Sequence, residues 1–282
     1  MRWRGERQSS NIEDRRGLSA GRVAVGGGLG TIVIMVLALL FGVNPQRLLE
    51  QIPSDEQPQV QTSRPQNAEQ DELKQFVAVV LGKTEDVWTD VFRQNGRQYR
   101  EPTLVLFTDQ VRSACGIAGA AVGPFYCPAD EKVYIDLSFY EELRRQFNAP
   151  GDFAQAYVVA HEVGHHVQKL LGISDRVDAM RGRVSEAEAN QLSVRLELQA
   201  DFFAGVFARY VQNQGVLEAG DIEEALRAAS AVGDDQIQRR TTGYVVPDSF
   251  THGTSEQRLR WFRKGYDTGD IRQGDTFNTR TL

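Results

Sequence analysis

The chain places two imidazoles and a carboxylate in one short run, His161-Glu162-Val163-Gly164-His165. This run reads H-E-x-x-H, the pattern of a zinc-binding helix in many metallopeptidases. Residues four apart lie on the same face of an α-helix, so His161 and His165 can reach one metal ion. Glu162 projects from the neighbouring side of that face, where it can take a proton from a water at the metal. The pattern therefore predicts a helix that holds Zn²⁺ for a hydrolytic reaction.

Histidine is scarce in this chain, and its distribution bears on whether the motif arose by chance. Only 4 histidines are present. His161, His165 and His166 fall in adjacent turns, while His252 stands apart. The alternative is an amphipathic helix with two chance histidines, and the clustering disfavours it. His166 lies about 100° around the helix from His165, so we expect it not to bind the same metal. It would support the site or lie on the surface.

A second motif, E-x-x-x-D, supplies candidates for the rest of the site. Glu197 and Asp201 are four residues apart and share a helix face. Glu197 can be the third protein ligand, which leaves the fourth tetrahedral position open for water. Asp201 can accept the free ring N–H of a ligating histidine. The alternative is a solvated acidic pair, which the apolar residues around both carboxylates disfavour. The spacing also permits the two carboxylates to exchange roles.

Three segments, HEVGHHVQ, ELQADFFAG and SFTHGTSEQRLRWF, together resemble the predicted neutral zinc metallopeptidases, a family of bacterial membrane-anchored proteins. The resemblance covers nearly the whole chain and implies a zincin-like peptidase domain. The layout is also similar to the gluzincins, which include HtpX-like and CAAX-processing enzymes. Those enzymes place E-x-x-x-D after the zinc helix and a histidine six residues before an arginine, here His252 and Arg258. They have several membrane spans, however, so the resemblance informs the zinc site more than the substrate.

The remaining site candidates lie outside the two motifs. His252 is the candidate for stabilising the oxyanion that develops during hydrolysis, with a structural histidine as the alternative. Arg258 would orient His252, bind a substrate carboxylate or form a surface salt bridge, and we expect the last. In gluzincins an edge strand before the zinc helix pairs with an extended substrate. Residues 123–137 are the corresponding candidate here, with ordinary core strands as the alternative.

An uncharged apolar segment near the start of the chain predicts a membrane anchor. Residues 23–43 contain no charged side chain and would span about 30 Å as a helix, the thickness of a bilayer core. Six arginines precede this segment, and the positive-inside rule then places residues 1–22 in the cytosol. The prediction is a single-pass protein of the cell membrane with an extracytoplasmic catalytic domain, periplasmic or extracellular.

The two cysteines agree with export. Cys115 and Cys127 are expected to form a disulfide, since bridged pairs persist outside the cytosol, and two free thiols are the alternative. The net charge is −6, which argues against nucleic acid as a partner. The predicted organisation is a cytosolic basic N-terminus at 1–22, a transmembrane helix at 23–43, a disordered linker rich in proline and glutamine at 44–70, and a zinc metallopeptidase domain at 71–282.

The predicted domain is α+β, mostly helical with a small sheet. Capping boxes at Asp152 and Thr254 and an Asp cap at Asp221 mark expected helix starts. Alternating apolar residues mark expected strands. Helices are expected at 71–94 with a break at Gly82, at 152–171, at 185–212, at 221–231 and from 254 onward, and strands at 103–108 and 132–137.

The sequence thus favours a membrane-anchored zinc metallopeptidase that acts on a protein or peptide substrate. An endopeptidase is favoured over an exopeptidase. The alternative is a catalytically inactive, zinc-stabilised module that binds or scaffolds partners at the membrane. Glu162 disfavours this alternative, because a structural zinc ion needs no general base and usually has four protein ligands.

Overall fold

Two of the expected strands form the centre of a four-stranded sheet in the computed structural model, which describes residues 1–17 and 68–282. β2 (Thr103–Phe107) and β6 (Lys132–Asp136) pair in parallel, and their central residues are buried. β1 (Ile12–Asp14) adds in parallel to β2, and β5 (Phe125–Cys127) adds antiparallel to β6. β5 is therefore an edge strand of the sheet, and it lies within residues 123–137, the segment expected to provide one.

A separate hairpin precedes β5 in the chain. It consists of β3 (Gln110–Ser113) and β4 (Gly116–Gly119), which pair antiparallel. Cys115, in the turn of this hairpin, is joined to Cys127 of β5 by a disulfide. The bridge fastens the hairpin to the edge strand of the main sheet.

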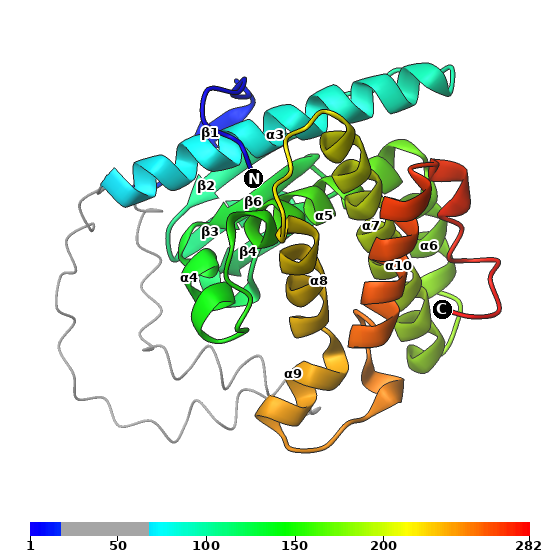
Figure 1. Cartoon of the computed structure of the whole chain (residues 1–282). Coiled ribbons are helices and arrows are strands. Elements are labelled where there is room, and N and C mark those ends of the chain that lie inside the picture. Colours follow the sequence, from blue (N-terminus) through cyan, green and yellow to red (C-terminus); the bar gives the residue numbers. More distant parts are fainter. Residues whose placement is uncertain (18–67) are drawn as a thin grey trace, which may run out of the picture. The chain divides into compact units, whose positions relative to one another are not determined.

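The long helix α3 (Ala68–Gln94) runs across the molecule beside β1 and β2 (Figure 1). The expected break at Gly82 is wrong, because the helix is continuous. Gly82 instead faces the N-terminal segment, where a Cβ atom would lie 2.9 Å from the Arg7 carbonyl oxygen. Arg7 and Ser9 both bind the buried carboxylate of Glu85, one turn along α3. The glycine therefore lets residues 1–16 dock against this helix.

The fold class and the localisation both need correction. In the residues that the structure describes, no helix is long and apolar enough to cross a membrane. The predicted span at 23–43 lies outside those residues, as does most of the predicted linker at 44–70. β1 and β2 belong to one sheet, so residues 12–14 cannot be cytosolic while the catalytic domain is extracytoplasmic. The described fold is mixed α+β, as predicted, whereas the predicted transmembrane helix and the single-pass, extracytoplasmic localisation are wrong.

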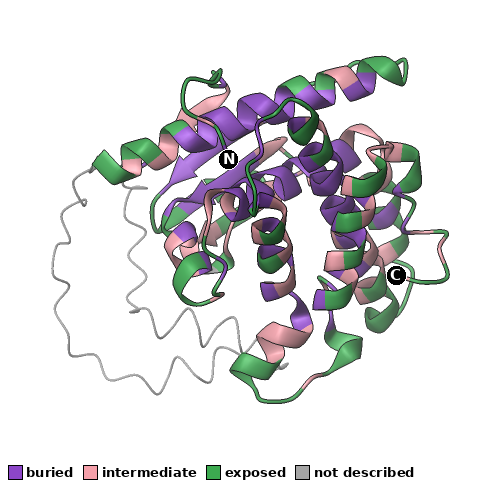
Figure 2. Ribbon diagram, in the orientation of Figure 1, coloured by how far each residue is buried: buried purple, intermediate pink, exposed green. Residues whose placement is uncertain are grey.

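The helices that follow the sheet contribute buried residues to the core on their inner faces, while their outer faces are exposed (Figure 2). α7 and α10 begin with complete capping boxes, at Ser185 and at Thr254. α5 lacks the expected box: its N-cap is Gly151, and Asp152 binds the amino group of Met1 at 2.6 Å. α8 likewise begins after Gly220 without a side-chain cap. The helices are α4 (Ser138–Arg145), α5 (Asp152–Leu170), α6 (Ile173–Arg181), α7 (Glu186–Asn213), α8 (Asp221–Ala231), α9 (Asp234–Thr241) and α10 (Ser255–Thr268), with 3₁₀ turns η1 (Ala120–Val122), η2 (Pro247–Ser249) and η3 (Ile271–Gln273).

Candidate metal centre

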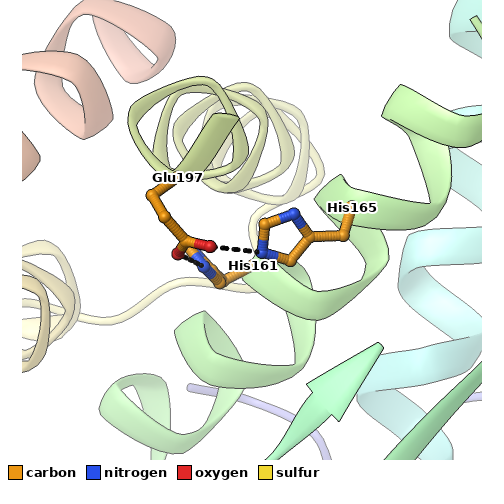
Figure 3. A group of neighbouring side chains, drawn as sticks. All are labelled: His161, His165 and Glu197. Atoms are coloured by element: carbon orange, nitrogen blue, oxygen red, sulfur yellow. Dashed lines mark hydrogen bonds and ion pairs between the residues drawn. The ribbon is translucent and has the colours of Figure 1, made fainter. Parts of the chain in front are cut away.

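The H-E-x-x-H helix α5 packs directly against α7, which carries the E-x-x-x-D motif. Gly164 makes this close approach feasible, because a Cβ atom there would lie 3.0 Å from the Ala200 carbonyl oxygen. The packing brings His161 and His165 to Glu197 (Figure 3). One ligand atom from each residue lies within 4.8 Å of the others. The structure thus assembles the three predicted metal ligands from two helices.

The three side chains converge through atoms that suit a metal ion. Glu197 Oε2 lies 3.1 Å from His161 Nε2, and Glu197 Oε1 lies 3.4 Å from His165 Nε2. The two imidazole rings are perpendicular, with centroids 4.9 Å apart. Two imidazole nitrogens and one carboxylate form the donor set of an open catalytic zinc site.

In both His161 and His165, Nδ1 lies next to a hydrogen-bond acceptor, while Nε2 faces Glu197. His161 Nδ1 lies 2.8 Å from Asp201 Oδ1, and His165 Nδ1 lies 2.9 Å from Gln168 Oε1. A carboxylate oxygen and an amide oxygen can only accept, so each Nδ1 carries the proton and donates it. Each Nε2 then keeps its lone pair for the metal. The residues present therefore fit a zinc ion, and Asp201 holds the place predicted for it.

Gln168 is a part of this arrangement that the motif did not reveal. Its side chain is buried, and its amide donates to Leu196 O at 2.7 Å and to Gln199 Oε1 at 3.1 Å. It therefore ties α5 to α7 while its oxygen orients His165. The available signal was its position three residues after His165, which places both on one helix face.

Arg258 is buried and does not form the expected surface salt bridge. Its residue is 3% exposed, and its guanidinium binds both oxygens of Asp201, at 2.9 and 3.0 Å. It also donates to Tyr157 Oη at 3.1 Å, while Tyr157 donates to Asp201. Asp201 thus accepts hydrogen bonds from Tyr157 and His161 of α5 and from Arg258 of α10. The ion pair fixes the carboxylate that orients His161, a candidate metal ligand.

The buried charged side chains of the site shift one another's pKa values toward the charged forms. Burial alone would lower the pKa of His161, but Asp201 and Glu197 raise it to about 10. Burial would raise the pKa of Glu197, yet the neighbouring imidazoles hold it well below its usual range. Arg258 and His161 likewise overcome burial and lower the pKa of Asp201. The pKa values of both candidate ligand imidazoles are raised, so protons compete with zinc for the two rings.

Removing the Arg258 guanidinium is expected to destabilise the fold strongly. Arg258→Met leaves Asp201 buried without its main counter-charge, and breaking a buried pair in this way costs about 3–5 kcal/mol. The free energy of unfolding from urea titration measures this loss. Arg260→Met is the matched control, since Arg260 lies on the same helix and pairs with the exposed Glu256. Equal losses in the two variants would contradict the assigned role.

Glu162 lies beside the metal ligands with its carboxylate uncommitted. The residue is 8% exposed, and within the described part of the chain it makes no hydrogen bond or ion pair. Burial lowers the pKa of His165, but Glu197 raises it above its usual value, and the nearby charge of Glu162 adds a smaller effect in the same direction. A carboxylate without a fixed partner next to a metal site is free to accept a proton.

His252 comes to the site from the loop between η2 and α10. Its side chain is 51% exposed, and its imidazole lies near enough to Glu197 for each to shift the pKa of the other toward its charged form. Its Nδ1 lies 3.0 Å from Thr251 Oγ1 and 3.3 Å from Asp234 Oδ1. Arg258, which was considered as a partner for this ring, binds Asp201 instead. Asp234 was not identified from the sequence.

His166 points away from the metal ligands into the protein. It is fully buried, Nε2 lies 2.6 Å from Arg100 O, and Nδ1 lies 3.0 Å from Tyr126 Oη. The carbonyl can only accept, so Nε2 carries the proton and Tyr126 donates to Nδ1. Burial lowers the pKa of His166, in keeping with a neutral ring. This residue ties the edge strand β5 to the zinc helix and does not lie on the surface.

Comparisons with known proteins agree with this geometry. A family model described as "Putative neutral zinc metallopeptidase" matches residues 1–277. Uncharacterized protein YpfJ of Escherichia coli (strain K12) is 49% identical over 286 residues, covering 98% of this chain and 99% of the relative. Uncharacterized protein Rv2575 of Mycobacterium tuberculosis (strain H37Rv) is 42% identical over 262 residues, covering 87% and 86%. No solved structure matches. The chain belongs to the neutral zinc metallopeptidase family.

Proposed function

We propose that the chain is a zinc-dependent endopeptidase. The observation that carries the proposal is the convergence of His161 Nε2, His165 Nε2 and the Glu197 carboxylate beside the uncommitted Glu162. A purely structural zinc site usually has four protein ligands and needs no neighbouring base. Three ligands with an adjacent free carboxylate suit hydrolysis instead.

Each residue of the site has one task in the proposed reaction. When bound, zinc supplies a Lewis acid that polarises the scissile carbonyl and acidifies a water molecule. His161, His165 and Glu197 hold the ion. Glu162 takes a proton from the attacking water and returns it to the leaving amine. His252 donates a hydrogen bond to the oxyanion that develops on the carbonyl.

Metal removal tests the proposal. The full-length chain, loaded with zinc, should hydrolyse casein, lose that activity in EDTA and regain it when zinc is restored. Thermal stability should fall in EDTA as well, because ligand deprotonation and metal binding are coupled to folding. Metal content, proteolysis and thermal unfolding are measured on the same samples. Stoichiometric zinc with thermal stabilisation but no hydrolysis would support a zinc-stabilised binding module instead.

Blocked peptides distinguish cleavage within a chain from trimming at its ends. A peptide acetylated at its amino terminus and amidated at its carboxyl terminus offers no free end for an exopeptidase. We expect such peptides to be cut internally, with products identified by mass spectrometry. Cleavage confined to unblocked peptides would contradict the endopeptidase assignment while leaving zinc-dependent hydrolysis intact.

A further inference from the structure

The first residue of α9, Asp234, holds the loop that carries His252. Its Oδ2 accepts three successive backbone N–H groups, from Thr251 at 2.8 Å, His252 at 2.6 Å and Gly253 at 2.9 Å. Its own N–H donates to Gly253 O at 2.9 Å. One nearly buried carboxylate thus fixes the backbone on both sides of the histidine.

The loop is also fixed against the helix that carries a metal ligand. Gly253 adopts a φ of +88°, and a Cβ atom there would lie 3.1 Å from Val194 of α7 and 3.4 Å from Leu198. The turn therefore sits on α7 next to Glu197. The main chain at His252 has little freedom to move relative to the metal ligands.

The second oxygen of Asp234 faces the imidazole itself. Asp234 Oδ1 lies 3.3 Å from His252 Nδ1, and Thr251 Oγ1 lies 3.0 Å from the same nitrogen. Both partners are on the Nδ1 side of the ring, and the half-exposed imidazole has no hydrogen-bond partner at Nε2 in the described residues. Nε2 is therefore the nitrogen available to a substrate.

We propose that Asp234 is the positioning residue for His252: it binds the Nδ1–H and the surrounding backbone, so that Nε2 is presented to the substrate. This inference rests on the proposed peptidase function. Burial lowers the pKa of His252, but Asp234 of α9 and Glu197 of α7 outweigh both burial and the Arg258 guanidinium of α10. When the ring is protonated, Nδ1–H stays with Asp234 and Nε2–H can donate to the oxyanion.

The neighbouring residue Asp235 provides a matched control. Its Oδ1 accepts from Ser255 N at 2.7 Å and from Ser255 Oγ at 2.9 Å, so it fastens the start of α10 to the first turn of α9. It holds local structure with the same kind of bonds, and among the described residues its hydrogen bonds and ion pairs do not include the His252 ring. Asp235→Asn therefore reports what loosening this region does by itself.

The kinetic test compares four full-length, zinc-loaded variants: Asp234→Asn, Asp235→Asn, His252→Ala and the double variant Asp234→Asn/His252→Ala. We expect Asp234→Asn to lower kcat about 10–100-fold, as for other orienting partners, with KM and zinc content nearly unchanged. Asp235→Asn should keep kcat within about twofold of wild type. In the His252→Ala background, Asp234→Asn should lower kcat no further. An equal loss in that background, or in Asp235→Asn, would overturn the proposal.

A second measurement does not depend on turnover. The chain has only 4 histidines, so ¹⁵N labelling of the imidazoles gives few ring signals. In the zinc-loaded protein, the titration midpoint of the His252 ring should lie at lower pH in Asp234→Asn than in wild type, because the carboxylate stabilises the imidazolium. An unchanged midpoint would overturn the role of Asp234. A shifted midpoint in a protein that cleaves no peptide would keep the Asp234 interaction and reject the peptidase proposal.

Discussion

Replacing Glu162 with glutamine is expected to lower kcat by about 10²–10⁴-fold while leaving the zinc content unchanged. The amide has almost the same volume as the carboxylate but cannot take a proton. Glu162 makes no hydrogen bond or ion pair within the described residues, so the substitution should not disturb the fold. Peptide hydrolysis under saturating substrate measures kcat, and metal analysis of the same preparation measures zinc.

The control for this substitution is Glu186→Gln, which makes the same chemical change at an exposed position in the first turn of α7. It should leave both kcat and zinc content near their wild-type values. Loss of zinc from Glu162→Gln would show that this carboxylate holds the metal. Full activity of Glu162→Gln would show that another group is the base.

Glu197→Ala is expected to weaken zinc binding about 10²–10³-fold and to abolish turnover at ordinary zinc concentrations. Structural zinc sites bind the ion with a free energy of about 10–16 kcal/mol. If four ligands contribute equally, each accounts for roughly a quarter of that free energy. The apo form should still fold, since Glu197 interacts mainly with the two imidazoles. Competition with a fluorescent chelator measures the zinc affinity, and unfolding in EDTA measures the stability of the apo form.

Compared with Glu197→Ala, Asp201→Asn should weaken zinc binding less and destabilise the apo form more. Its effect on zinc affinity is expected to be about 10–100-fold, as for a residue that orients a ligand. Its effect on stability in EDTA should be the larger of the two, because it leaves the buried Arg258 without its carboxylate partner. Unchanged zinc affinity in Glu197→Ala together with loss of zinc in Asp201→Asn would mean that the carboxylates have exchanged roles.

The part of the site that follows helical periodicity could be predicted from the sequence. The i, i+4 spacing fixed which faces carry His161, His165, Glu197 and Asp201, and the structure brings these faces together. The capping box predicted at Thr254 was equally local, and it is present at the start of α10. The capping pattern at Asp152 failed because that carboxylate binds Met1, a partner 151 residues away.

The residues that were missed depend on tertiary contacts. Gln168 and Asp234 are ordinary polar residues in the sequence, and they acquire a role only when α5 meets α7 and α9 meets the His252 loop. Arg258 looked like a surface charge because its partner Asp201 lies 57 residues earlier. The localisation failed for a related reason. Hydropathy reports local composition, and it could not show that the arginine-rich first residues join the sheet of the domain.

The docking of the first residues on the sheet also has a consequence for the order of folding. β1 pairs with β2, about ninety residues later in the chain, so it cannot find its partner while the first part of the protein is being synthesised. At about 5–20 residues per second, this strand waits roughly 5–20 s after it is made. Contacts so distant in sequence are slow to form, and an unpaired strand is prone to aggregate in the meantime. β1 reads Ile12-Glu13-Asp14, and charged side chains of this kind disfavour aggregation of an unpaired strand. In the folded protein the two carboxylates pair with Lys132 and Lys74.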